Sequence, residues 1–198
     1  MTKIASQEKV TNQFLQSKKA NEDTLALLAS SIEIAAEMLI NCLLNGNKIL
    51  CCGNGGSASA SQHFSSELLN RYEMNRPGLP AIALTTDTST ITSISNDDDF
   101  QKIFSRQIKA IGQPNDILVA FTTSGKSANI VEAIKAAQSR NLPTLVLSGK
   151  DGGLISEILS EEDLELLVPS SSTARIQEIH LLITHCLCEL IDDHLFGE

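Results

Sequence analysis

The sequence predicts an α/β fold, a doubly wound three-layer sandwich of about five parallel strands with helices on both faces. Three observations predict it. Each candidate strand is a short continuous apolar run, typical of strands buried on both faces, and these runs alternate with helical segments. The succession strand, small-residue loop, helix also occurs twice, over 48–70 and 116–140. Crossovers between parallel strands are right-handed, and ligands of such sheets bind beyond the carboxyl ends of the strands.

The 198 residues fit one domain. We expect a single domain over 1–198, in which helices over 1–45 pack against another subunit and an α/β sandwich follows over 46–198. The net charge of −9 argues against a nucleic-acid partner. We see no signal peptide and no segment long enough to cross a membrane, so we expect a cytoplasmic protein with no membrane partner. Its five cysteines lie in apolar segments, which favours reduced thiols in the core.

The first half of the chain begins with two expected helices, because apolar residues recur at spacings of three and four. The second is the stronger, and Asn45-Gly46-Asn47 ends it. The elements expected here, in chain order, are helices over 7–19 and 21–44, a strand over 49–52, a helix over 57–71, a turn over 75–78, a strand over 80–84 and a short helix over 88–95.

The second half opens with a polar break over 96–99 that can cap a helix, a more ordinary role for an acidic run than metal binding. The elements that follow are a helix over 100–111, a strand over 116–121, a hydroxyl-rich loop over 122–127, a helix over 128–140, a strand over 142–148, a loop over 149–153, a strand over 164–168 and a last helix over 173–194.

The glycine-rich turn at 53–56 is the first candidate site. It joins a buried strand to a helix N-terminus, and its missing side chains would let an anion approach unpaired backbone N–H groups. His63 and Glu67 follow four residues apart and therefore share one helix face. The plainer interpretation is a pair on the helix surface, but its place just after the turn favours a site.

The loop at 122–127 is the second candidate. Its hydroxyl groups suit a phosphate monoester, although a Ser/Thr-rich helix cap is the plainer alternative. Two other phosphate fingerprints fail. GNGGS lacks the spacing of the dinucleotide triplet, and Ala120 stands where a nucleotide-triphosphate loop would need its leading glycine. The four hydroxyls are Thr122, Thr123, Ser124 and Ser127.

These blocks together resemble the phosphoheptose isomerases of the sugar isomerase (SIS) domain superfamily, from about residue 44 to residue 190. The resemblance implies a flavodoxin-like α-β-α fold. The matching blocks are Cys52-Gly53-Asn54-Gly55-Gly56-Ser57, His63 and Glu67, Arg71-Tyr72, Asn75-Arg76-Pro77-Gly78, Asn96-Asp97, Thr123-Ser124-Gly125, Ser127-Ala128-Asn129, Gly149-Lys150-Asp151-Gly152-Gly153 and Arg175-Ile176-Gln177-Glu178-Ile179-His180.

The resemblance also implies conversion of sedoheptulose 7-phosphate to D-glycero-D-manno-heptose 7-phosphate, toward the heptose of lipopolysaccharide. It implies a cytoplasmic homotetramer with Zn²⁺ and with sites at subunit interfaces. Glu67 and His185 would be the catalytic base and acid of an enediol mechanism. The implied metal ligands are His63, Glu67, Gln177 and His185. The implied sugar-phosphate contacts are Asn54, Gly55, Gly56, Ser57, Glu67, Arg71, Asn96, Asp97, Thr122, Thr123, Ser124, Ser127 and Gln177.

One geometric tension accompanies this ligand set. Gln177 and His185 are eight residues apart, about 12 Å along a helix, so sharing one metal requires both side chains to reach inward or a second chain to contribute. Ala174 also departs from the aspartate usual in the isomerases, which puts one substrate-side contact in question.

A second resemblance gives an alternative function. The segments 45–52, 79–84 and 186–192 are similar to the DnaA initiator-associating proteins, which are non-enzymatic tetramers that bind the replication initiator. That branch tends to lose the glutamate and the late histidine. Because Glu67 and His185 are both present, the sequence favours the isomerase.

Overall fold

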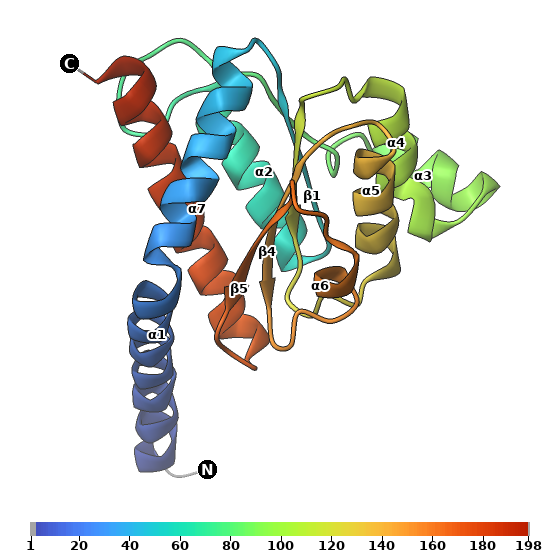
Figure 1. Cartoon of the computed structure of the whole chain (residues 1–198). Helices are drawn as coiled ribbons and strands as arrows, with labels where there is room; N and C mark the ends of the chain where they lie inside the picture. Colours follow the sequence, from blue (N-terminus) through green and yellow to red (C-terminus); the bar gives the residue numbers. More distant parts are fainter. Residues whose placement is uncertain (1–2, 198) are drawn as a thin grey trace.

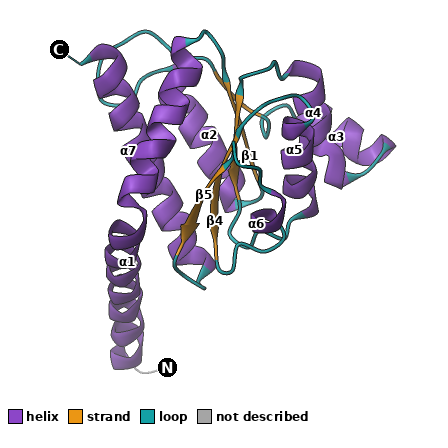
Figure 2. Ribbon diagram, in the orientation of Figure 1, coloured by secondary structure: helices purple, strands orange, loops and turns teal. Residues whose placement is uncertain are grey.

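The computed structural model describes residues 3–197 and contains one parallel sheet between two layers of helices (Figures 1 and 2). This confirms the predicted fold class. The elements are α1 (Lys3–Leu44), β1 (Ile49–Gly53), α2 (Gly56–Leu69), β2 (Ala81–Ala83), α3 (Thr88–Asp97), the 3-10 helix η1 (Phe100–Lys102), α4 (Ile103–Ile111), β3 (Ile117–Phe121), α5 (Ala128–Gln138), β4 (Thr144–Gly149), α6 (Ile155–Ile158), β5 (Leu164–Val168) and α7 (Thr173–Phe196).

The sheet has the strand order β2-β1-β3-β4-β5, and every pair is parallel. The chain leaves β1 for β2 on one side and returns to β3 on the other, so the strand order reverses at the β1/β3 boundary. Gly53, the last residue of β1, is in register with Phe121, the last of β3. The two candidate loops therefore start side by side at the crevice where such sheets bind ligands.

The core is divided by the sheet, because successive strand residues point to opposite faces. Cys51 faces a layer made by α1, α2 and α7. Its neighbour Cys52 faces the layer that contains α4, α5 and α6, against which α3 also packs. Helices cover both faces of the sheet, so the strand side chains on both faces are mostly apolar. This explains why each strand is a continuous apolar run in the sequence.

The N-terminal segment differs from the prediction of two helices, since α1 is one continuous helix of 42 residues. The polar stretch around residue 20 contains neither glycine nor proline. Its side chains bond back to helix carbonyls, with Asn21 Nδ2 donating to Ser17 O (2.8 Å) and Thr24 Oγ1 to Ala20 O (2.7 Å). The polar side chains near residue 20 therefore make the exposed face of α1 polar at this point, but they do not end the helix.

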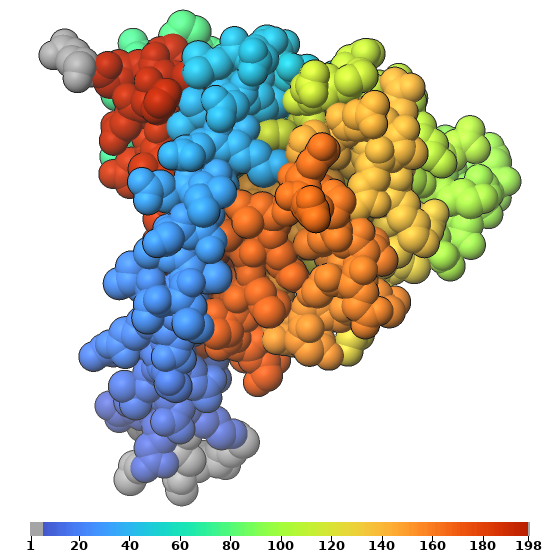
Figure 3. Space-filling model, in the orientation of Figure 1, coloured from blue at the N-terminus to red at the C-terminus, as the bar shows by residue number. Residues whose placement is uncertain are grey.

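The first half of α1 extends beyond the rest of the molecule (Figure 3), and large apolar side chains are exposed along both halves of this helix. Contrary to the expectation from sequence, the stretch Ser6–Leu44 is long and apolar enough to cross a membrane, by length and composition alone. Helices that bury an apolar face against protein pass the same test, so this is weak evidence for a membrane span. The exposed residues are Val10, Phe14, Leu15, Leu25, Leu27 and Ile34.

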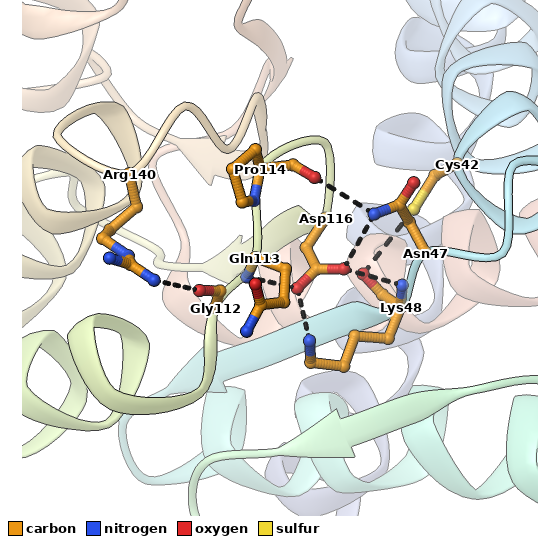
Figure 4. A network of polar contacts seen from close by, with 8 residues as sticks. All are labelled: Cys42, Asn47, Lys48, Gly112, Gln113, Pro114, Asp116 and Arg140. Carbon is orange, nitrogen blue, oxygen red and sulfur yellow. Dashed lines mark hydrogen bonds and ion pairs between the residues drawn. The ribbon is translucent and has the colours of Figure 1, made fainter.

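The amino ends of β1 and β3 are joined by a polar network around Asp116 (Figure 4). The Asp116 carboxylate accepts hydrogen bonds from the backbone N–H groups of Lys48 (2.9 Å) and Gln113 (2.7 Å), and it pairs with Lys48 Nζ at 2.5 Å. Burial alone would raise the pKa of Asp116, but these hydrogen bonds outweigh burial and lower it. The network lies at the edge of the sheet opposite the candidate loops.

Two smaller differences concern the second half of the chain. The helix expected from residue 100 starts as the 3-10 turn η1, whose cap is Asp99, because the Asp99 carboxylate accepts a bond from Gln101 N. The one-turn helix α6 was not expected at all. The strand predicted over 164–168 has the bounds observed for β5.

Candidate functional site

The loop between β1 and α2 is shaped by glycines. Gly55 has φ +56°, a left-handed conformation that glycine adopts without strain. A Cβ on Gly53 would collide with the Ser57 backbone, and one on Gly56 would lie 2.5 Å from Gln177 Nε2. The predicted ligand residues Asn54, Gly55, Gly56 and Ser57 thus form a tight turn at the start of α2, in which Gly55 alone of the three glycines has open space beside it.

The loop between β3 and α5 has similar properties. Gly125 has φ +61°, and a Cβ there would collide with the carbonyl oxygen of Gly152. The Thr122 hydroxyl accepts a hydrogen bond from Gly125 N at 3.2 Å, which closes the loop. Thr123, Ser124 and Ser127 are each partly exposed, so their hydroxyls can reach a ligand.

An amide pair connects the two loops. Asn54 Nδ2 donates to Asn129 Oδ1, and Asn129 Nδ2 donates to Asn54 Oδ1, both at 2.8 Å. Asn129 is 3% exposed and lies in the first turn of α5. Sequence reasoning quoted Asn129 within a matching block but gave it no role, because no local pattern predicts a partner 75 residues away.

The titratable residues gather further along α2 and α7. His63 Nε2 lies 3.1 Å from His185 Nε2 and 3.4 Å from Glu67 Oε1. The Tyr72 ring stacks on the His185 imidazole, with centroids 5.7 Å apart and an interplanar angle of 27°. The structure therefore brings together both predicted catalytic residues and His63, and it adds Tyr72, to which the sequence gave no role.

Gln177 lies elsewhere on α7. Its carboxamide is beside Gly56, while His185 faces His63. The residue numbers of these two contacts, Gly56–Gln177 and His63–His185, increase along both helices, so α2 and α7 run parallel. The separation of about 12 Å expected between Gln177 and His185 along the helix holds within this subunit.

The suitability of the site for zinc rests on its donors. In the part of the chain that the structure describes, no group of three His, Cys, Asp or Glu side chains has the spacing of a formed metal site. However, two imidazoles and a carboxylate are donor types that zinc binds at about 2.0–2.2 Å. Two such donors in a tetrahedral site would be about 3.3 Å apart, close to the 3.1 and 3.4 Å measured around His63 Nε2. The donors thus fit zinc in type, and the two pairs that include His63 fit it in spacing.

Three predicted contacts lie apart from this cluster. Arg71 is exposed and donates to Glu73 O at 3.1 Å. Asn96 and Asp97 are exposed at the end of α3 and bond to each other at 2.8 Å. Because α3 packs on the opposite face of the sheet from α2 and α7 (Figure 1), one subunit does not bring Asn96 and Asp97 to His185.

His180 lies on the same helix as His185 but in different surroundings. It is fully buried, and its Nε2 lies 2.9 Å from Ser148 O. Burial lowers the pKa of His180 to about 4, so the ring is neutral near pH 7. His180 is therefore a hydrogen-bonded core residue, and its buried ring has no access to substrate.

Comparison with known proteins identifies the family. The SIS domain family model matches residues 13–149, more than half of the chain. The curated phosphoheptose isomerase of Chromohalobacter salexigens is 56% identical over 191 residues, which are 96% of this chain and 97% of that protein. This chain belongs to the phosphoheptose isomerase family. The phosphoheptose isomerase of Shewanella loihica gives the same picture, at 57% identity over 96% of this chain and 97% of that protein.

Solved structures of phosphoheptose isomerases also match the fold. The enzyme from Francisella tularensis has a TM-score of 0.94 and 45% identity, covering 98% of this chain and 100% of that chain. The enzyme from Neisseria gonorrhoeae has a TM-score of 0.90 and 45% identity, covering 94% and 98%. These matches support the isomerase over the replication-initiator scaffold.

Proposed function

We propose that this chain converts sedoheptulose 7-phosphate to D-glycero-D-manno-heptose 7-phosphate, a precursor of the heptose in lipopolysaccharide. Its relatives carry the isomerase name at 56% identity. The observation that carries the proposal is the contact of His185 with His63, which in turn lies beside Glu67. The Glu67 carboxylate and the His185 imidazole thus both lie beside His63, which provides the base and the acid that an aldose–ketose isomerisation requires.

The two loops would hold the phosphate and the sugar. Hydroxyls of Thr123, Ser124 and Ser127, together with N–H groups at the start of α5, suit a phosphate monoester. The glycine turn at 53–56 would lie along the sugar, since open space surrounds Gly55 where a side chain would stand. The Asn54–Asn129 pair supports this arrangement because it fixes one loop against the other.

Glu67 and His185 would move the protons. The Glu67 carboxylate takes a proton from C1 of the ketose, which leaves an enediol, and returns it to C2. The His185 imidazole transfers the O1 proton to O2, so that the carbonyl group moves from C2 to C1. Imidazole is suited to this role because it both donates and accepts protons near neutral pH.

A zinc ion would be held by His63, Glu67 and His185, with Gln177 as the fourth predicted ligand. Bound there, it would polarise the sugar oxygens as a Lewis acid. Because Gln177 lies beside Gly56 in this subunit, its contribution requires a side-chain rearrangement or the Gln177 of another subunit.

We further propose a cytoplasmic homotetramer. The exposed apolar side chains of α1 support it, since a surface of this kind is typical of an interface. The helix α3 supports it as well, because none of its residues is buried although it carries Asn96 and Asp97. Packing of a second subunit there would bring these two predicted contacts to a site they do not reach within one chain.

The decisive experiment is an isomerase assay of the purified wild-type protein with sedoheptulose 7-phosphate. We expect turnover that a chelator removes and added zinc restores. Turnover that is insensitive to chelator would contradict the zinc proposal alone. No turnover with zinc supplied would contradict the isomerase itself.

A further inference from the structure

The segment between α2 and β2 contains a buried arginine that touches both helices of the candidate site. Arg76 is 8% exposed, and its Nε donates to Asp192 Oδ1 at 2.6 Å. Its two terminal nitrogens donate to backbone carbonyls near the end of α2, at 2.9 Å to Leu68 O and 2.9 Å to Glu67 O. One guanidinium thus joins α7 to the backbone of Glu67 itself.

The placement of this arginine follows from helix chemistry. The last carbonyls of a helix have no partner within the helix and carry partial negative charge. Arg76 satisfies two of them at the end of α2 with a planar set of donors. Its guanidinium carbon also lies 5.8 Å from the ring centroid of Phe196 near the end of α7, which holds the group from one side.

On α7, Asp192 is seven residues after His185. Seven residues are just short of two full turns, so both side chains lie on the same face of the helix, about 10 Å apart along its axis. The contacts between α2 and α7 therefore occur at three successive levels: Gly56 with Gln177, His63 with His185, and the end of α2 with Asp192 through Arg76.

We propose that Arg76 and Asp192 are positioning residues that fix the axial register of α2 against α7 and thereby hold Glu67 opposite His185. This inference rests on the proposed isomerase function. Among the described contacts, neither residue is hydrogen-bonded to an imidazole: Arg76 donates to Asp192, Leu68, Pro77 and Glu67. Both side chains are almost fully buried, at 1% and 4% exposure. Their effect on the reaction passes through the backbone of Glu67.

Stability alone does not account for the pair. A buried ion pair is often replaceable by apolar side chains without loss of stability, whereas removal of one partner is strongly destabilising. Asp192 Oδ2 has no hydrogen-bond partner among the residues described here, so the carboxylate is not fully satisfied by the fold. A pair that is poorly suited to stabilisation is better explained by the geometry that it imposes.

The test compares Arg76→Lys with the double variant Arg76→Met/Asp192→Leu. Lysine keeps the charge but lacks the planar fork that reaches two carbonyls and a carboxylate together. We expect kcat to fall by roughly 10–100-fold in both variants, as for small misplacements of reacting groups. KM for sedoheptulose 7-phosphate should change less than about threefold, because the phosphate loops lie at the other end of α2.

Thermal stability separates positioning from plain stabilisation. The double variant should melt close to the wild type and still have low kcat. If its kcat recovers together with its Tm, the pair only stabilises the fold and the proposal is wrong. The matched control is Lys48→Met/Asp116→Leu, which removes the ion pair that joins the amino ends of β1 and β3 and does not contact α7; its kcat should equal that of the wild type at temperatures below its Tm.

A crystal structure of the double variant provides a readout that does not depend on activity. We expect α2 to shift along α7 and the His63–His185 Nε2 separation to depart from 3.1 Å. An unchanged separation would overturn the proposal even if the wild type is an active isomerase. A wild type without turnover would overturn the isomerase, and the register shift would then decide on the positioning role by itself.

Discussion

His63 and His185 face each other through their Nε2 atoms, 3.1 Å apart, although 122 residues separate them in the chain. As a hydrogen bond, this contact has one nitrogen that donates its hydrogen and one that accepts it. A metal ion could take the place of that hydrogen, because imidazole ligands bind metal in the unprotonated form. The proposed proton transfer and the proposed zinc site therefore share this pair of histidines.

The first prediction concerns the two catalytic candidates. Glu67→Gln and His185→Gln should each lower kcat by roughly 10²–10⁴-fold, the usual contribution of a general acid or base. Both side chains are partly exposed, so the variants should fold, which circular dichroism would verify. His194→Gln, an exposed histidine on the same helix, is the control. Full activity in Glu67→Gln would rule out Glu67 as the base.

The second prediction concerns the amide pair. Asn129→Asp keeps an acceptor for Asn54 Nδ2 but loses the donor to Asn54 Oδ1. An unpaired buried polar group costs about 1–3 kcal/mol, and the new charge would repel a phosphate. We expect KM for sedoheptulose 7-phosphate to rise about tenfold or more, measured by steady-state kinetics. The exposed Asn45→Asp is the charge-matched control, and an equal KM in both variants would contradict the prediction.

The third prediction compares two glycines with positive φ. Gly46 has φ +75° and open space around a would-be Cβ, whereas Gly125 has φ +61° and the Gly152 carbonyl in that place. Gly46→Ala should cost about 1 kcal/mol, from backbone strain alone. Gly125→Ala should cost more and also raise KM, because the hydroxyl loop must move. Denaturant unfolding and kinetics measure both, and an unchanged KM in Gly125→Ala would argue against phosphate binding by this loop.

The fourth prediction is a loss of stability in acid. Because burial lowers the pKa of His180 to about 4, while an unfolded histidine has a pKa near 6.5, the unfolded state binds more protons between these values. Stability therefore falls as pH decreases from about 6.5 to 4, by roughly 2 kcal/mol between pH 7 and pH 5. Urea unfolding of the wild type and of His180→Gln should show a smaller decrease in the variant, and identical pH dependence would refute this assignment. The stabilisation by Asp116, whose pKa is lowered from 3.8, is lost below about pH 5 and so does not interfere between pH 7 and pH 5.

Much of the fold could be predicted from sequence because the strands are continuous apolar runs. The bounds of β5 were predicted to the residue. The meeting of the two loops followed from topology, since the carboxyl ends of neighbouring parallel strands share one edge. The continuity of α1 differs from the two helices expected over 7–19 and 21–44, because the segment between them contains no glycine or proline that would break a helix.

The parts of the candidate site that escaped prediction depend on distant partners. Arg76 lies in an Asn-Arg-Pro-Gly turn, where an arginine is normally exposed, and only the fold shows that it meets Asp192 116 residues later. Tyr72 belongs to the matching block Arg71-Tyr72, but only the fold shows that its ring stacks on His185. Periodicity and motif spacing describe residues that are close in sequence, whereas Arg76 and Tyr72 contact residues that are more than 100 positions away.

Cys51 and Cys52 point to opposite faces of the sheet, so their thiols can report separately on the opening of the two helix layers. Cys42, Cys51 and Cys188 lie in the layer of α1, α2 and α7, while Cys52 alone among the five cysteines faces the layer of α4 and α5. Burial raises the pKa of Cys52 to about 12, so it will react with thiol reagents only when its layer opens. Labelling rates at the two adjacent positions would thus show which layer separates from the sheet first.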